Sequence, residues 1–117
     1  MDDFQRALIA TGFPYSSAEN RDDLDLVINR LHRLLPNCQD IRRFGSAALD
    51  LCYVAEGMFD GFYEINLKPW DVSAGMLIVK EAGGIVSNEK GEEFDMFNDK
   101  TIVASNGIIH KEFLSYF

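Results

Sequence analysis

The stretch of sequence that decides the fold covers residues 58–84 and reads MFDGFYEINLKPWDVSAGMLIVKEAGG. Residues 58–66 alternate between two faces, as the side chains of a strand do. One predicted face carries Phe59, Gly61, Tyr63 and Ile65, and the other carries Asp60, Phe62 and Glu64. Pro69 then introduces a helix predicted over residues 71–82, and two consecutive glycines end it. A strand that passes directly into a helix is typical of a crossover unit.

The same alternation continues on both sides of this stretch. Upstream, the pattern predicts a helix that begins after Asn20 and ends at Pro36, a short strand over residues 40–43, and a second helix between Gly45-Ser46 and Gly57. Downstream, it predicts strands over 85–87 and 101–105, a turn over 88–91 and a last helix over 108–116. We therefore expect one α/β unit spanning residues 1–117, with a mixed, largely parallel sheet and flanking helices.

The first predicted helix carries one apolar stripe, and we expect that stripe to be buried. Its positions are Leu24, Val27, Ile28, Leu31, Leu34 and Leu35. In the helix over 71–82, Gly75 costs about 1 kcal/mol relative to alanine, so we expect a close packing contact there.

Composition narrows the function. The formal charge of −8 and the pI of about 4.6 disfavour nucleic acid as a direct partner, since a duplex rewards clustered cations. The charge fits a site that concentrates divalent cations, and it equally fits a solvated acidic surface. The two cysteines have neither metal-type nor disulfide spacing, the amino terminus is acidic, and no apolar run could span a bilayer. We expect a reduced, cytoplasmic protein that binds no membrane.

Few residues suggest chemistry on physical grounds alone. Asp71 falls in the first turn of its helix, where a carboxylate caps the free N–H groups and could equally coordinate Mg²⁺. Trp70 beside it is expected to anchor the helix to the core. His32 and His110 have no evident partner, so both are interpreted as surface residues.

Four segments together resemble the inositol monophosphatase family, and the first of them resembles its bacterial, suppressor-type branch. They are Thr11-Gly12-Phe13-Pro14-Tyr15, Arg43-Phe44-Gly45-Ser46-Ala47-Ala48-Leu49-Asp50-Leu51, Asp60-Gly61-Phe62-Tyr63-Glu64, and Trp70-Asp71-Val72-Ser73-Ala74-Gly75 with Glu81-Ala82-Gly83-Gly84. The segments follow the family's order and spacing and cover nearly the whole chain. The resemblance implies the carboxyl-terminal subdomain of that fold.

The resemblance also implies roles for single residues. Asp71 would be a Mg²⁺ ligand, and Glu64 would accept hydrogen bonds from substrate hydroxyls, although a solvated residue on a strand face is the alternative. Gly45, Ser46 and Ala47 would line the substrate pocket, partly through backbone groups. Lys68 lies where family members vary, so it would bear on substrate preference or lie at the pocket rim. The family's other metal ligands, an earlier Glu and an Asp-Pro-Ile-Asp-Gly-Thr motif, do not occur in these 117 residues.

Two functions follow from this resemblance. The first is a Mg²⁺-dependent phosphomonoesterase for a polyol or sugar phosphate, in which this chain supplies one metal ligand and the polyol-binding side. Because Mg²⁺ binds weakly to a lone carboxylate, we expect the chain alone to have little activity. The alternative is a non-catalytic module used for dimerisation or partner binding. Family members commonly form homodimers, so we expect one here.

Overall fold

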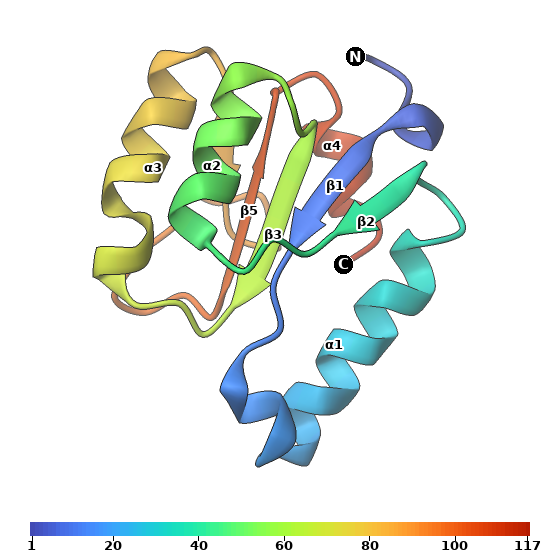
Figure 1. Cartoon of the computed structure of the whole chain (residues 1–117), viewed down its shortest axis with the longest axis vertical. Coiled ribbons are helices and arrows are strands. Elements are labelled where there is room, and N and C mark those ends of the chain that lie inside the picture. Colours follow the sequence, from blue (N-terminus) through green and yellow to red (C-terminus); the bar gives the residue numbers. More distant parts are fainter.

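The computed structural model describes residues 1–117, and its centre is a five-stranded mixed sheet in the order β2-β1-β3-β5-β4 (Figure 1). The strands are β1 (Leu8–Thr11), β2 (Asp40–Arg42), β3 (Gly61–Ile65), β4 (Ile85–Ser87) and β5 (Thr101–Ser105). β1 pairs in parallel with β2 and β3, whereas β5 runs antiparallel to β3 and β4. The predicted mixed α/β sheet with flanking helices is confirmed, and its parallel part is limited to the first three strands.

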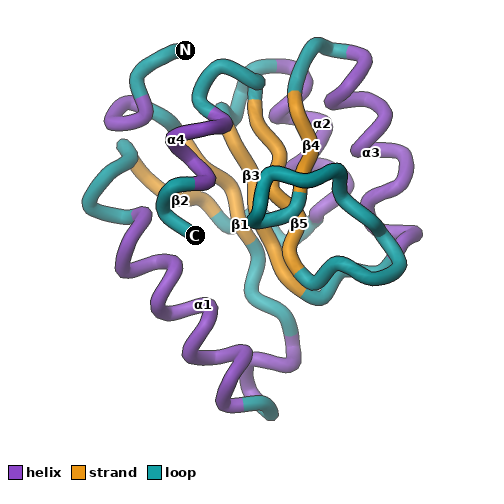
Figure 2. Tube along the Cα trace, turned by 180° about the vertical axis from the view of Figure 1, so that it is seen from behind, coloured by secondary structure: helices purple, strands orange, loops and turns teal.

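Helices cover both faces of the sheet. They are α1 (Arg21–Leu34), α2 (Ala47–Glu56), α3 (Pro69–Glu81) and α4 (His110–Leu114), with short 3₁₀ turns η1 (Phe4–Arg6) and η2 (Tyr15–Ala18). α2 and α3 pack side by side over one face of the sheet, and α4 lies on the opposite face (Figures 1 and 2). No helix has the length and apolar character that a bilayer crossing requires.

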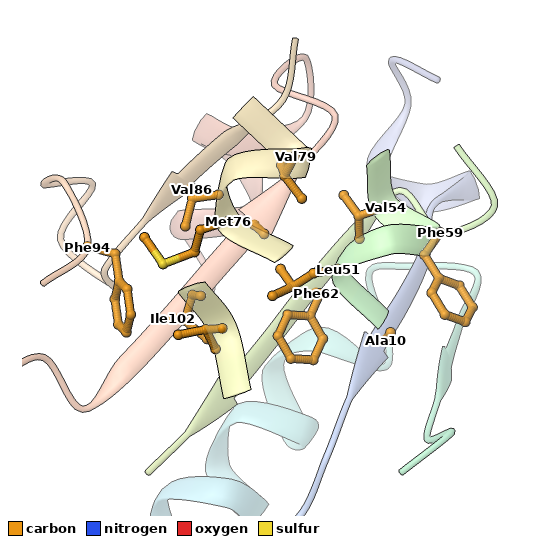
Figure 3. Packing of buried hydrophobic residues seen from close by; sticks show 12 residues of the cluster. Ala10, Leu51, Val54, Phe59, Phe62, Met76, Val79, Val86, Phe94 and Ile102 are labelled. Atoms are coloured by element: carbon orange, nitrogen blue, oxygen red, sulfur yellow. The ribbon is translucent and has the colours of Figure 1, made fainter. Parts of the chain in front are cut away.

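The larger of two core clusters fills the space between the sheet and the α2–α3 layer (Figure 3). Leu51 of α2 and Phe62 of β3 are both completely buried there. The predicted close contact at Gly75 is confirmed, because a Cβ built on Gly75 would lie 2.7 Å from the Leu51 Cβ atom. The absence of a side chain at Gly75 thus lets α2 and α3 approach each other closely.

The second core cluster lies on the α4 face and contains Tyr63, Val103, Ile109 and Phe113. Phe62 and Tyr63 are neighbours on β3 but belong to opposite clusters, which agrees with the predicted alternation. The surface interpretation of His110 is wrong, because this residue is only 5% exposed and its two ring nitrogens lie within hydrogen-bond distance of two buried serines.

α1 departs from its predicted packing. Asn20 caps it as expected, since its Oδ1 accepts hydrogen bonds from two backbone N–H groups of the first turn. Of the predicted apolar stripe only Leu34 is fully buried, and Ile28 is 53% exposed. The other buried residues of the helix are Arg30 and Asp23. Arg30 donates a hydrogen bond to Thr101 of β5, and Asp23 accepts one from Asn66 in the loop after β3. Leu24, Val27 and Leu31 of the stripe are half-buried, so the stripe faces the rest of the chain but only its carboxyl-terminal end reaches the core.

The sequence pattern missed β1, an interior strand that lies between β2 and β3. β1 has only four residues and begins right after a 3₁₀ turn, so it offers too short a run for a period-two signal. The other strands and helices lie where they were predicted, although α4 is shorter than the predicted helix over 108–116.

Candidate substrate-binding site

A large hollow opens at the edge of the sheet where its three parallel strands end. The loops that follow β1, β2 and β3 line a cavity of about 570 Å³. Ligands of open α/β sheets bind at this position, outside the carboxyl ends of parallel strands, because helices also begin there. All five residues that the resemblance implies for the site, Gly45, Ser46, Ala47, Glu64 and Asp71, line this cavity. Their placement is observed, whereas their roles remain predictions.

The first turn of α2 forms one wall. Gly45 has a φ of 86°, a backbone conformation that side chains disfavour, and it turns the chain from β2 into the helix. Ser46 is the N-cap, and its Oγ accepts a hydrogen bond from the Leu49 N–H at 3.3 Å. The start of a helix carries free N–H groups and a partial positive charge, so this wall is suited to bind an anionic or hydroxyl oxygen.

The start of α3 forms another wall, and there Asp71 serves as a cap. Its Oδ2 accepts a hydrogen bond from the Lys68 N–H at 3.0 Å, while the Asp71 N–H donates to the Lys68 carbonyl at 2.9 Å. The other carboxylate oxygen makes no hydrogen bond within the chain. Capping and metal coordination are therefore compatible, since one oxygen holds the helix end and the other remains available.

Glu64 of β3 also lines the cavity. Its side chain lies over Gly12, where a Cβ would come within 2.2 Å of the Glu64 Oε1 atom. Burial, followed by the negative charges of Asp50 and Asp71, raises the pKa of Glu64 to about 7, and Arg43 partly opposes this. Glu64 makes no hydrogen bond within the chain, so its carboxyl group is free to bind a ligand hydroxyl.

Sequence reasoning missed two residues of this region, Gly12 and Asp50. Gly12 had a usable signal, since it precedes Phe13-Pro14 in a segment that resembles the family. Asp50 had none, because an acidic residue in the first turn of a helix is ordinarily an exposed cap partner. Here it is 1% exposed, neither oxygen has a hydrogen-bond partner, and burial raises its pKa to about 6.

Two cations also line the cavity. The Arg43 guanidinium lies 5.5 Å from the centre of the Phe13 ring, and Lys68 is the residue before α3. Neither forms an ion pair with a carboxylate of this chain, which leaves both charges available to an anionic ligand. The prediction that Trp70 anchors α3 is wrong: its side chain is 78% exposed at the cavity rim, and Val72 supplies the buried contact instead.

Known proteins match both the sequence and the geometry. The family model described as "Inositol monophosphatase family" matches residues 1–117. The chain is 46% identical over 113 residues to Nus factor SuhB of Escherichia coli strain K12, which covers 97% of this chain and 41% of that protein. It is 40% identical to the chloroplastic phosphatase IMPL1 of Arabidopsis thaliana, covering 97% of this chain and 29% of that protein.

Two solved structures superpose closely. The inositol monophosphatase of Anabaena has a TM-score of 0.91 at 35% identity, covering 99% of this chain and 44% of that chain. The extragenic suppressor protein SuhB of Bartonella henselae has a TM-score of 0.87 at 39% identity, covering 99% and 43%. The chain thus spans less than half the length of these relatives. The family model matches all of residues 1–117, and both the sequence similarity to suppressor-type proteins and the fold agree with that match. The chain belongs to the inositol monophosphatase family.

Proposed function

We propose that this chain is the substrate-binding part of a Mg²⁺-dependent phosphomonoesterase that acts on a polyol or sugar phosphate. One observation carries the proposal: a single cavity at the ends of three parallel strands brings together Glu64, Asp71 and the amino terminus of α2. The family of phosphatases to which the chain belongs supports the reaction class.

Different residues of the cavity would bind different parts of such an ester. Glu64 accepts hydrogen bonds from neighbouring hydroxyl groups of the polyol, for which a carboxylate offers several acceptor positions. The N–H groups at the start of α2 donate to substrate oxygens, and the unpaired charges of Arg43 and Lys68 attract the anionic ester. The preferred polyol is the inositol ring of the family name.

The donor set fits Mg²⁺ only in part. Asp71 offers a hard oxygen ligand on a rigid helix start, which suits this cation. When bound, the ion supplies a more acidic water and neutralises charge on the leaving oxygen. No three Asp, Glu, His or Cys side chains of the chain come together to hold a metal. We therefore expect the chain by itself to bind Mg²⁺ weakly and to show little turnover.

Binding and turnover test separate parts of this proposal. Amide shifts of the 15N-labelled chain on titration with myo-inositol 1-phosphate should move at residues 45–47 and 64, and Glu64→Gln should weaken the binding. Asp25→Asn, a change on the exposed face of α1, is the matched control. Shifts spread over other surfaces would refute the site. If the chain alone releases phosphate, and the release needs both Mg²⁺ and Asp71, the expectation that the chain by itself shows little turnover is wrong.

A non-catalytic module for dimerisation or partner binding is the second candidate. It is favoured by the name Nus factor carried by several relatives and by exposed apolar side chains on the α2–α3 layer, such as Leu49 and Leu77. In this case light scattering should show a dimer or a complex without phosphate release. A monomer that binds no hydrophobic dye would contradict this candidate. It would also contradict the expectation that the chain exposes an apolar surface for another part of the protein to cover.

A further inference from the structure

Three buried polar side chains meet on the α4 face of the sheet, away from the cavity. His110 begins α4, and its Nε2 lies 2.7 Å from the Ser87 Oγ while its Nδ1 lies 2.8 Å from the Ser105 Oγ. Ser87 ends β4 and Ser105 ends β5, and the antiparallel register places both on the face that carries Val103. All three are at most 5% exposed. One imidazole therefore joins two strands to a helix.

The other hydrogen bonds of the serines fix the positions of the protons. The Ser87 hydroxyl donates its one hydrogen to the Asn88 carbonyl at 2.8 Å, so its oxygen can only accept from the His110 Nε2–H. The Ser105 oxygen already accepts the Gly107 N–H at 3.0 Å, and its own hydrogen is free to be donated to Nδ1. The neutral imidazole with its proton on Nε2 satisfies every one of these groups.

We infer that His110 is held as the neutral Nε2–H tautomer and acts as a proton-sensitive clasp that fastens α4 to the ends of β4 and β5. The inference is independent of the phosphatase proposal, since none of the three residues lines the cavity.

A second proton on His110 breaks this arrangement. A hydrogen on Nδ1 would point at the hydrogen of the Ser105 hydroxyl. The Ser105 hydroxyl would then lose its only acceptor in a buried place. Burial also lowers the pKa of His110, and no charged group of β4, β5 or α4 contributes to the shift in either direction. Because the folded-state pKa lies below the ordinary value, the clasp is intact above about pH 6.5 and is lost as the pH falls through the folded-state pKa.

Loss of the clasp would loosen α4 in particular. α4 has only five residues, too few to be stable alone, and it is held by the burial of Ile109 and Phe113. Phe113 packs against Phe4 and Tyr63, so opening α4 exposes an aromatic cluster. The cavity is formed by other elements, so it should remain intact when α4 opens.

The test uses imidazole 15N NMR of the wild-type chain between pH 5 and pH 8. We expect His110 at pH 7.5 to show a protonated Nε2 and an unprotonated Nδ1, with no averaging between tautomers. A histidine in a short unstructured peptide serves as the reference. A protonated Nδ1 at that pH, averaged tautomers, or protonation of His110 over the same pH range as the peptide histidine would overturn the inference.

Hydrogen exchange tests the consequence. The Phe113 N–H donates a hydrogen bond to the Ile109 carbonyl at 2.9 Å. The opening constant of this amide, corrected for intrinsic exchange, should rise as the pH falls from the unfolded-state pKa of His110 to its folded-state pKa, by up to about tenfold per pH unit. Ser105→Ala should reduce this pH dependence, whereas Ser73→Ala on the exposed side of α3 should preserve it. An opening constant that does not change with pH would refute the clasp even if the tautomer is as assigned.

Discussion

Replacing Asp50 by asparagine should stabilise the protein at neutral and alkaline pH. The Asp50 carboxyl is 1% exposed and has no hydrogen-bond partner on either oxygen. Burial raises its pKa from 3.8 to about 6, so the folded state binds this proton more tightly than the unfolded state. The contribution of Asp50 to stability is therefore greatest below about pH 4 and falls as the pH rises through 6.

The size of the effect follows from the shift. At about 1.36 kcal/mol per pKa unit, an ionised Asp50 costs the folded state about 3 kcal/mol at pH 8, and the cost shrinks to about 0.5 kcal/mol at pH 4. The asparagine side chain has nearly the same shape and carries no charge. We expect Asp50→Asn to raise the free energy of unfolding by up to about 3 kcal/mol at pH 8, with a difference that fades towards pH 4.

Urea unfolding followed by circular dichroism at pH 4, 6 and 8 measures this directly. Asp25→Asn is the control. Because Asp25 is exposed, this substitution should change the free energy of unfolding only slightly at every pH. A second readout is the carboxyl carbon shift of Glu64, whose pKa should fall when the neighbouring charge is removed. If Asp50→Asn lowers stability at pH 8, the carboxylate has a favourable partner and the burial argument is wrong.

Three further substitutions test the local packing. Gly75→Ala should destabilise by about 1 kcal/mol or more in urea unfolding, because overpacking against Leu51 outweighs the helix propensity of alanine; the exposed Ser73→Ala on the same helix should be neutral, and equal behaviour of the two would contradict the close contact. Gly12→Ala should change stability by less than about 1 kcal/mol yet weaken inositol 1-phosphate binding about tenfold in calorimetry, because it displaces the flexible end of Glu64; unchanged affinity would count against Glu64 as a binding group. Ser46→Ala should cost about 1 kcal/mol through loss of the α2 cap, measured by thermal unfolding against Ser73→Ala, and no loss would mean that the cap is replaced by water.

The sequence determined the elements that carry a strong local signal. The helix starts at Asn20, at Gly45-Ser46 and at Pro69 were readable because capping and φ preferences act within a few residues. The close contact at Gly75 was predictable because an interior helical glycine is costly. The five residues implied for the site were found through family resemblance, since a lone Asp or Glu has no pattern of its own.

The tertiary structure alone decided what depends on contacts between distant segments. β1 is an interior strand because β2 and β3 pair with its two edges, although its four residues give no periodicity. His110 was interpreted as a surface residue, yet packing of α4 on the sheet buries it, and packing of α2 on the sheet buries Asp50, which no sequence signal singled out. Burial changes the ionisation of a carboxyl or an imidazole by removing water, and the sequence around a residue does not state which other elements will cover it.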